Sequence, residues 1–339
     1  MAFDFTPLAE QLAFAVDGPL AIAKGGKPRF EVDPWGSDSF YNWATGWQKE
    51  GGRFFNVEAS AYDLYNVEAR YVGPEIDRAE VNGATFSSII LPTFVGELDA
   101  SNLLGSYLSA SAVEYLSLSD IFSSSASVGW LGDGYIEDIH QSWLGVDYLS
   151  GRLMIDDGEN IFVNVNYSNF GIVQVNDVQG GEVRVNAGKV DMNVYGSNDL
   201  TIDLTGTYGS GVGVVWSGWE SPVIVLGGAG NDSFDFFGSR VAYNPGAGKD
   251  YVNIEGGNTI GNGIDGDPDT FVFKGGRHSV EADGVDQILI DTGAGWWDVA
   301  SIDAIDGNEN GVAEWYGADG GLTTVAFTFV ETYDDWLKG

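Results

Sequence analysis

The stretch Gly227-Gly228-Ala229-Gly230-Asn231-Asp232-Ser233-Phe234-Asp235 decides the fold expected for this chain. It fits the nonapeptide G-G-x-G-x-D-x-U-x, in which U is a large apolar residue. The frame returns 18 residues later as Pro245-Gly246-Ala247-Gly248-Lys249-Asp250-Tyr251-Val252-Asn253. A degenerate copy, Gly263-Ile264-Asp265-Gly266-Asp267-Pro268-Asp269, precedes a further short apolar run. Repetition at a fixed spacing indicates turns that stack on one another, with Phe234, Tyr243 and Val252 pointing inward.

Such turns contain what a calcium site requires. Glycine permits the left-handed backbone angles that aim carbonyl oxygens at one point, and aspartate supplies a hard carboxylate oxygen. Ca²⁺ takes six to eight oxygens at about 2.3–2.6 Å, which is more than one turn offers. Turns one coil apart must therefore share the ion. The alternative is a ladder of glycine-rich turns that binds no metal.

Short alternating segments lie upstream of the glycine turns, and turn residues separate them. They are Phe162–Asn166, Ile172–Asn176, Glu182–Asn186, Val190–Val194, Leu200–Leu204 and Val223–Leu226. Their central residues recur every ~10 positions, so two strands would form one coil of about 18 to 20 residues. A regular period of short strands favours a solenoid over the alternative, a β-sandwich.

At these motifs the chain resembles the RTX family, the hemolysin-type calcium-binding repeat proteins. The resemblance implies a parallel β-roll or β-helix solenoid with Ca²⁺ between its turns. It also implies which residues bind the ion: Gly227, Gly228, Gly230, Asp232, Gly246, Gly248 and Asp250, and in the degenerate copy Asp267 and Asp269. The chain departs from the family pattern at Pro245 and in the intervening turn at residues 236–241, which has no motif. One side of the roll is therefore expected to hold one or two ions.

A second candidate calcium loop begins at Asp306. Oxygen-bearing side chains occupy its positions 1, 3, 5 and 9, and glycine occupies position 6, as in the first part of an EF-hand loop. These side chains are Asp306, Asn308, Asn310 and Glu314. Position 12 is Gly317, so the bidentate glutamate is missing. The segment resembles the shorter loops near the C-terminal ends of secreted RTX proteins, and the alternative is a plain Asx-rich turn.

These signals divide the chain into three expected regions. Residues 1–155 are predicted to be a β-rich or α+β attachment region, with a helix at Pro7–Val16 and a helical segment at Leu103–Phe122. Residues 156–292 are predicted to be the solenoid and residues 293–339 its cap. The alternating stretch after Thr323 is either a closing strand or part of a C-terminal secretion signal.

Composition narrows the classes of partner. Lys and Arg number 15 against 50 Asp and Glu, giving a net charge of -35 at pH 7. Such a chain repels nucleic acid and anionic lipid, and divalent cations would relieve its self-repulsion. No apolar run reaches the ~18 residues of a membrane span, so no membrane insertion is expected. The first residues lack a basic region and do not form a signal peptide. We therefore expect an extracellular protein, exported by type I-like secretion, or a virion component.

The sequence contains no convincing enzyme active site. Two histidines, His140 and His278, and no cysteine exclude histidine-rich zinc sites and cysteine nucleophiles. No H-E-x-x-H motif is present, and 50 acids offer too many pairs to select one for glycoside hydrolysis. The expected function is a calcium-stabilised structural or adhesive protein of a cell-surface layer, filament or virion fibre. Its expected partners are copies of itself, other surface proteins or cell-surface glycans. The alternative is a secreted carbohydrate-active enzyme with an RTX tail.

Overall fold

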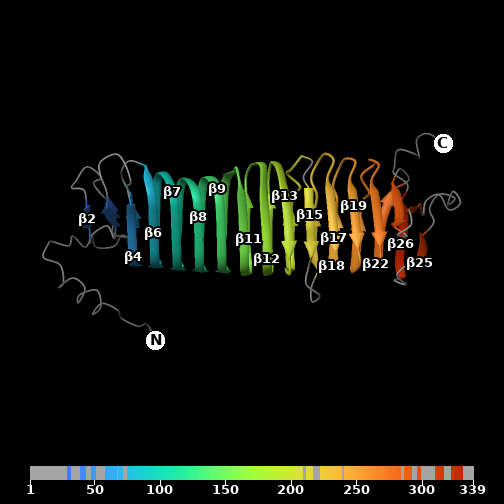
Figure 1. Ribbon diagram of the computed structural model, residues 1–339, viewed down its shortest axis with the longest axis horizontal. Coiled ribbons are helices and arrows are strands. Elements are labelled where there is room, and N and C mark those ends of the chain that lie inside the picture. The colour runs from blue at the N-terminus through green and yellow to red at the C-terminus, as the bar shows by residue number, and fades with distance from the viewer. Residues whose placement is uncertain are drawn as a thin grey trace, which may run out of the picture.

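The protein is a rod of stacked β-coils (Figure 1). The computed structural model describes residues 29–31, 39–42, 47–50, 58–66, 68–71, 75–208, 211–216, 222–238, 240–283, 286–291, 296–298, 310–316 and 322–330. Nearly all of these residues are in strands, and they form a solenoid of about 11 turns. No helix with the length and apolar composition of a membrane span occurs among them. The predicted parallel solenoid is confirmed. The helix expected at Pro7–Val16 lies outside the described residues.

The described residues form twenty-six strands, which follow one another along the chain. Those of the first half are β1 (Arg29–Glu31), β2 (Ser39–Asn42), β3 (Trp47–Glu50), β4 (Glu58–Tyr65), β5 (Glu68–Arg70), β6 (Ile76–Thr85), β7 (Ser88–Leu104), β8 (Tyr107–Phe122), β9 (Ser125–His140), β10 (Trp143–Leu149), β11 (Arg152–Val165) and β12 (Ser168–Val185). Those of the second half are β13 (Gly188–Tyr195), β14 (Asn198–Asp203), β15 (Gly211–Trp216), β16 (Val223–Leu226), β17 (Ser233–Phe237), β18 (Arg240–Asn244), β19 (Tyr251–Glu255), β20 (Asn258–Asn262), β21 (Thr270–Lys274), β22 (Gly276–Asp283), β23 (Gln287–Asp291), β24 (Trp296–Asp298), β25 (Asn310–Tyr316) and β26 (Leu322–Val330).

Each coil stacks on the next in parallel register, so equivalent residues form columns along the rod. Val163 pairs with Val183, and Val183 pairs with Ile202 one coil further on. All three are buried, as are Val173 and Met192. The interior is a single continuous column of aliphatic and aromatic side chains. Because each coil contacts only its neighbours, the stability of the rod is a sum of local terms.

The coils bend at residues in the left-handed region of backbone space. A column of short polar residues, one per coil, has φ between 52° and 55°: Asn102, Asp120, Asp138, Asp157 and Asp177. Asn and Asp tolerate this conformation better than other residues with a side chain. Some of the acidic residues of the chain therefore form the corners of the solenoid.

A ladder of buried serines lines a neighbouring corner. The backbone amide of Ser87 donates to Oγ of Ser106, that of Ser106 to Oγ of Ser124, and that of Ser124 to Oγ of Ser142, at 3.0–3.1 Å. The four side chains are 1–5 % exposed. Each hydroxyl satisfies an amide that the bend takes out of the regular strand ladder.

The helical segment predicted at Leu103–Phe122 is wrong, because β7 and β8 occupy it. In β8 the buried residues are Leu108, Ala110, Val113, Leu116, Leu118 and Ile121, so successive inward positions are two or three residues apart. The bends in the coil cause the steps of three, and this mixture of steps hides the alternation of a strand.

The solenoid also begins earlier than predicted. Strands β6, β7, β8, β9 and β11 already pair in parallel, coil on coil. The expected boundary between residues 155 and 156 falls inside β11. Described residues upstream of that boundary therefore belong to the same ladder as those downstream.

Antiparallel strands flank the coils at both ends. At the N-terminal end β2, β3 and β4 pair antiparallel. At the other end β26 pairs in parallel with β22 and antiparallel with β25. β26 buries Val325 and Phe327, so the strand predicted for this stretch closes the last coil.

Candidate metal centre in the stacked glycine turns

The two glycine turns stack directly on each other, as their 18-residue spacing predicts. Ala229 and Ala247 form a parallel bridge in which the Ala247 amide donates to the Gly228 carbonyl at 2.9 Å and the Gly230 amide to the Ala247 carbonyl at 2.7 Å. Gly246 and Gly248 have φ of 100° and 133°, which side chains disfavour. A Cβ at Gly246 would also collide with the Gly228 carbonyl oxygen. Glycine is therefore required here for stacking as well as for conformation.

A column of buried aspartates closes these turns. Asp232, Asp250, Asp269 and Asp286 are 1–7 % exposed. The Asp232 amide donates to Oδ1 of Asp250 at 2.7 Å, the Asp250 amide to Oδ1 of Asp269 at 2.9 Å, and the Asp269 amide to Oδ1 of Asp286 at 2.9 Å. Oδ2 of Asp232 accepts from the Gly228 amide at 3.0 Å. Oδ1 of Asp250, Asp269 and Asp286 thus links each of these coils to the preceding one.

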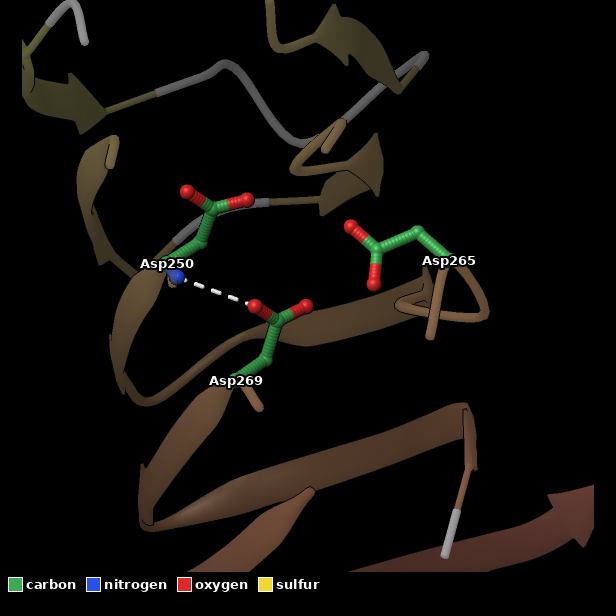
Figure 2. Close-up of side chains that lie close together, drawn as sticks. All are labelled: Asp250, Asp265 and Asp269. Carbon is green, nitrogen blue, oxygen red and sulfur yellow. Dashed lines mark hydrogen bonds between the residues drawn. The ribbon is translucent and has the colours of Figure 1, made fainter. Parts of the chain in front are cut away.

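The second oxygens of two of these carboxylates are orphaned. Oδ2 of Asp250 and Oδ2 of Asp269 are buried and have no hydrogen-bond partner among the described residues. The exposed Asp265 reaches toward them from the third turn (Figure 2). The three carboxylates place one oxygen each within 4.8 Å of one another. Buried carboxylate oxygens without donors are costly, and a shared cation satisfies them together.

The raised pKa values of two carboxylates in the cluster also favour a cation site. Burial, with the charges of Asp232, Asp265 and Asp267, raises the pKa of Asp250 to about 7. Burial, with the charges of Asp250, Asp286 and Asp265, raises the pKa of Asp269 to about 8. Without a cation, protons therefore remain on these groups near neutral pH. A divalent ion would displace them because it neutralises both charges at once.

The cluster suits a hard divalent cation by its donor set. All three side chains offer oxygen only, and no histidine or cysteine is part of the group. Oxygen ligands are those of Ca²⁺ and Mg²⁺ rather than of zinc or copper. The preference of Ca²⁺ for six to eight oxygens is compatible with carboxylates supplemented by turn carbonyls and water.

The structure places the predicted ligands in two groups. Asp250 and Asp269 belong to the carboxylate cluster, whereas Asp267 is exposed and lies outside it. The others, Gly227, Gly228, Gly230, Asp232, Gly246 and Gly248, lie in the two stacked turns. Asp265 was not predicted as a ligand. The third turn has one residue more than the second, since Asn262 aligns with Asn244 but Asp269 with Asp250, and this insertion moves Asp265 to the cluster.

The second candidate loop is not a compact turn over the part that the structure describes. Asn310 and Glu314 both lie in β25, paired antiparallel with β26. An extended strand places Cα atoms four residues apart at about 13 Å, so the two residues do not lie in one compact turn. Asp306 and Asn308 lie outside the described residues. The expectation of a calcium site from Asp306 to Glu314 therefore stays a prediction.

The two histidines differ in their burial and in their hydrogen-bond partners. His140 is partly exposed, and its Nε2 lies 2.7 Å from Oδ1 of Asp138. His278, in contrast, is 5 % exposed. Its Nδ1 lies 3.0 Å from Oγ1 of Thr259, and its Nε2 lies 2.6 Å from the Gly275 carbonyl, which fixes a neutral ring with the proton on Nε2. Burial lowers its pKa to about 4.

Comparison with known proteins adds no relative. The chain matches no protein-family model, no curated protein and no solved structure.

Proposed function

We propose that this protein is a calcium-stabilised, extracellular structural or adhesive rod of the RTX type. The observation that carries the proposal is the group of Asp250, Asp265 and Asp269, with two orphaned buried oxygens, in turns that fit the RTX nonapeptide. The setting is a cell-surface layer, filament or adhesin, or a virion fibre. Self-association or binding to other surface proteins would build the larger assembly.

The mechanism follows from linkage between ion binding and folding. An ion that binds only the folded coils stabilises them by RT ln(1 + [L]/Kd), about 2.7 kcal/mol when free calcium is about 100 times Kd. In low calcium the buried carboxylates disfavour the stacked turns. In the high calcium concentration outside a cell, the bound ion stabilises the stacked turns. Each bound Ca²⁺ also offsets two units of the net charge of -35.

Thermal melting of the purified chain with Ca²⁺, with Mg²⁺ and with EGTA tests this function. The proposal predicts a higher melting temperature in Ca²⁺ than in EGTA and a smaller effect of Mg²⁺, whose octahedral geometry suits this side-chain set less well. Equal melting temperatures in the three solutions would refute it. Electron microscopy of the native particle then separates the surface-layer from the virion setting.

A second candidate function is a carbohydrate-active enzyme, and a groove on another part of the rod favours it. The groove has a volume of about 720 Å³ and crosses β7, β8, β9, β11 and β12. Its lining includes three carboxylates and three exposed aromatic rings: Glu97, Asp99, Asp133, Tyr115, Tyr135 and Phe170. Pairs of carboxylates carry glycoside hydrolysis in many enzymes.

Incubation with neutral and acidic polysaccharides distinguishes the two functions. Release of reducing or unsaturated ends by the wild type, lost in Glu97→Gln and Asp133→Asn, would favour the enzyme. Intact polymers in every incubation would leave the structural rod as the function.

A further inference from the structure

A second, smaller groove lies on the outer face of three consecutive coils. Register pairs Trp143 of β10 with Phe162 of β11 and Phe162 with Glu182 of β12. Two residues further along each strand, Gly145 pairs with Asn164 and Asn164 with Arg184. The groove has a volume of about 280 Å³ and is lined by Trp143, Phe162, Asn164, Glu182, Arg184 and Asn186. It combines an aromatic side with a polar side.

The aromatic side is a flat platform. A Cβ at Gly145 would collide with three atoms of the six-membered ring of Trp143, so the indole lies across the glycine backbone. Trp143 is nevertheless 39 % exposed, which leaves its second face to solvent. Its neighbour Phe162 is 53 % exposed. Large aromatic side chains normally bury most of their surface, so two adjacent exposed rings indicate a binding surface.

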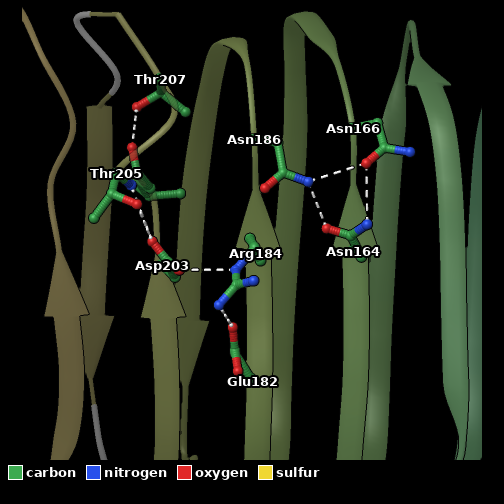
Figure 3. A network of polar contacts seen from close by, with 9 residues as sticks. Asn164, Asn166, Glu182, Arg184, Asn186, Asp203, Thr205 and Thr207 are labelled. Carbon is green, nitrogen blue, oxygen red and sulfur yellow. Dashed lines mark hydrogen bonds and ion pairs between the residues drawn. The ribbon is translucent and has the colours of Figure 1, made fainter.

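The polar side is fixed by a network that Figure 3 shows. The side-chain amide of Asn186 donates to Oδ1 of Asn164 at 2.7 Å and to Oδ1 of Asn166 at 3.0 Å. The side-chain amide of Asn164 donates to Oδ1 of Asn166 at 3.1 Å, and that of Asn166 donates to Oδ1 of Asp147 at 2.7 Å. Each amide group retains hydrogen-bonding capacity beyond these bonds, because it has two donors and an acceptor with two lone pairs.

Arg184, on the same side of the groove, is held by two carboxylates. Its guanidinium contacts Oε1 of Glu182 at 2.6 Å and Oδ2 of Asp203 at 2.8 Å. Thr205 Oγ1 donates to Asp203 at 2.7 Å, so the carboxylate is itself held in place. A guanidinium braced by two carboxylates presents its remaining N–H donors in a fixed direction.

The side chains that line the groove indicate the class of ligand that it would bind. A flat apolar ring surface next to fixed amides, a carboxylate and a guanidinium matches a sugar ring, which has an apolar C–H face and a rim of hydroxyl groups. Carboxylates outnumber the single Arg184 here, and the chain carries a net charge of -35, so an anionic polymer is repelled. We propose that this groove binds a neutral saccharide of one or two units, stacked on Trp143 and hydrogen-bonded by Asn164, Arg184 and Asn186.

A peptide ligand fits the groove less well. Peptides gain affinity on a sheet by adding a strand to an open edge. Both edges of β11, which forms the groove floor, are already paired, with β10 or β9 on one side and β12 on the other. Only side chains are therefore offered to the ligand. Trp143 and Phe162 are neighbours in one column, and coils spaced about 4.8 Å apart place them at a separation close to the length of one hexose unit.

This inference deepens the adhesive part of the proposed function and does not depend on its calcium part. The groove lies in β10, β11 and β12, whereas the carboxylate cluster lies in the turns around β19 and β21. If calcium does not raise the melting temperature but the saccharide binds, only the metal site is refuted. If calcium raises the melting temperature but no saccharide binds, only the groove is refuted.

Calorimetric titration of the full chain, in Ca²⁺, with neutral cello-, manno- and malto-oligosaccharides tests the inference, with oligogalacturonate as the anionic probe. We expect at least one neutral probe to bind and the anionic probe not to bind. Trp143→Ala removes the platform, and Gly145→Ala displaces the indole while leaving it in the chain. Both should weaken binding about tenfold or more. Ile224→Ala is the matched control, because Ile224 is an exposed apolar residue two coils beyond Glu182 in the same column.

Four outcomes would overturn the inference. They are no binding of any neutral probe at millimolar concentration, binding that both Trp143→Ala and Gly145→Ala leave unchanged, equal weakening by Ile224→Ala, and preference for the anionic probe. The melting temperature of each variant is measured in parallel to check that it folds.

Asn186→Asp serves as the polar-side variant if Trp143→Ala does not fold, because it keeps the size of the side chain. Asn186→Asp should also weaken binding, because it removes an amide donor.

Discussion

The backbone amide of Asp250 donates to Oδ1 of Asp269 at 2.9 Å, while Oδ2 of the same Asp269 carboxylate is buried without a partner in the described part of the chain. One oxygen therefore joins two coils, and the other is the oxygen that we propose binds the cation. A cation at the proposed site would offset two units of the net charge of -35.

Asp250→Asn and Asp269→Asn should have opposite effects with and without calcium. Asparagine keeps the Oδ1 acceptor of the ladder and places an N–H₂ donor where the orphaned oxygen was. In EGTA each variant should gain about 2 kcal/mol, because a donor replaces a repelled charge. In Ca²⁺ each should lose most of the calcium-induced rise in melting temperature. Asp267→Asn, in the same turn, is the control. It removes a charge that contributes to the raised pKa of Asp250 but no oxygen of the cluster, so it should keep most of the calcium-induced rise in melting temperature.

The effect of calcium should grow with pH. The folded-state pKa values of about 7 for Asp250 and about 8 for Asp269 lie above the unfolded value near 4. Metal-free stability should therefore fall as pH rises from about 4 through 8, where the buried groups ionise. Calcium binds the ionised form, so its stabilisation should be large at pH 8 and small at pH 6.

The pH experiment is best kept above pH 6. The pKa of His278, lowered to about 4 by burial, lies below its unfolded value of about 6.5, so this residue contributes a loss of stability as pH falls through that range. Melting temperatures between pH 6 and 8.5, with Ca²⁺ and with EGTA, isolate the aspartates. A calcium effect that is constant over this range would contradict the assignment.

Ser124→Ala should destabilise the coils by about 1–3 kcal/mol, because it leaves the buried Ser106 amide without its acceptor. Ser125→Ala, one residue away and only partly buried, should change stability by less than about 0.5 kcal/mol. Hydrogen exchange of the amides around Ser106 measures the effect where it occurs, since coils open locally. Equal protection in the two variants would show that the ladder does not stabilise the corner.

Tyr243→Phe should be neutral or stabilising. The ring packs against Phe236 and Phe271, with centroids 5.3 and 6.2 Å away, and phenylalanine retains these contacts. The hydroxyl is buried with no hydrogen-bond partner among the described residues, so its removal should raise stability by up to about 1 kcal/mol. A marked loss of stability on denaturant unfolding would instead mean that the hydroxyl has a bound partner, such as water.

The second half of the solenoid could be predicted because its inward residues keep a simple rhythm. Val163, Val183 and Ile202 alternate with polar residues and recur with each coil, and the Gly227 turn marks one corner unambiguously. There, short strands and glycine turns are visible in the sequence without any knowledge of which coil contacts which.

The first half was missed because its corners contain no glycine motif. Serines such as Ser106 and Ser124 satisfy the bent backbone from inside, and residues such as Asp120 and Asp138 adopt the left-handed conformation. Both columns recur every 18 to 20 residues, so a search for that period in Ser, Asn and Asp would have found them. Asp265 was missed for a different reason. One inserted residue moved it into the cluster, and no periodic pattern encodes an insertion.

The most direct test of the calcium site is a crystal structure of the protein grown in CaCl₂, with anomalous scattering measured to identify the ion. The account predicts an anomalous peak between Asp250, Asp265 and Asp269, with six to eight oxygens at about 2.3–2.6 Å. A well-ordered map with only water, or no density, among these three carboxylates would contradict it.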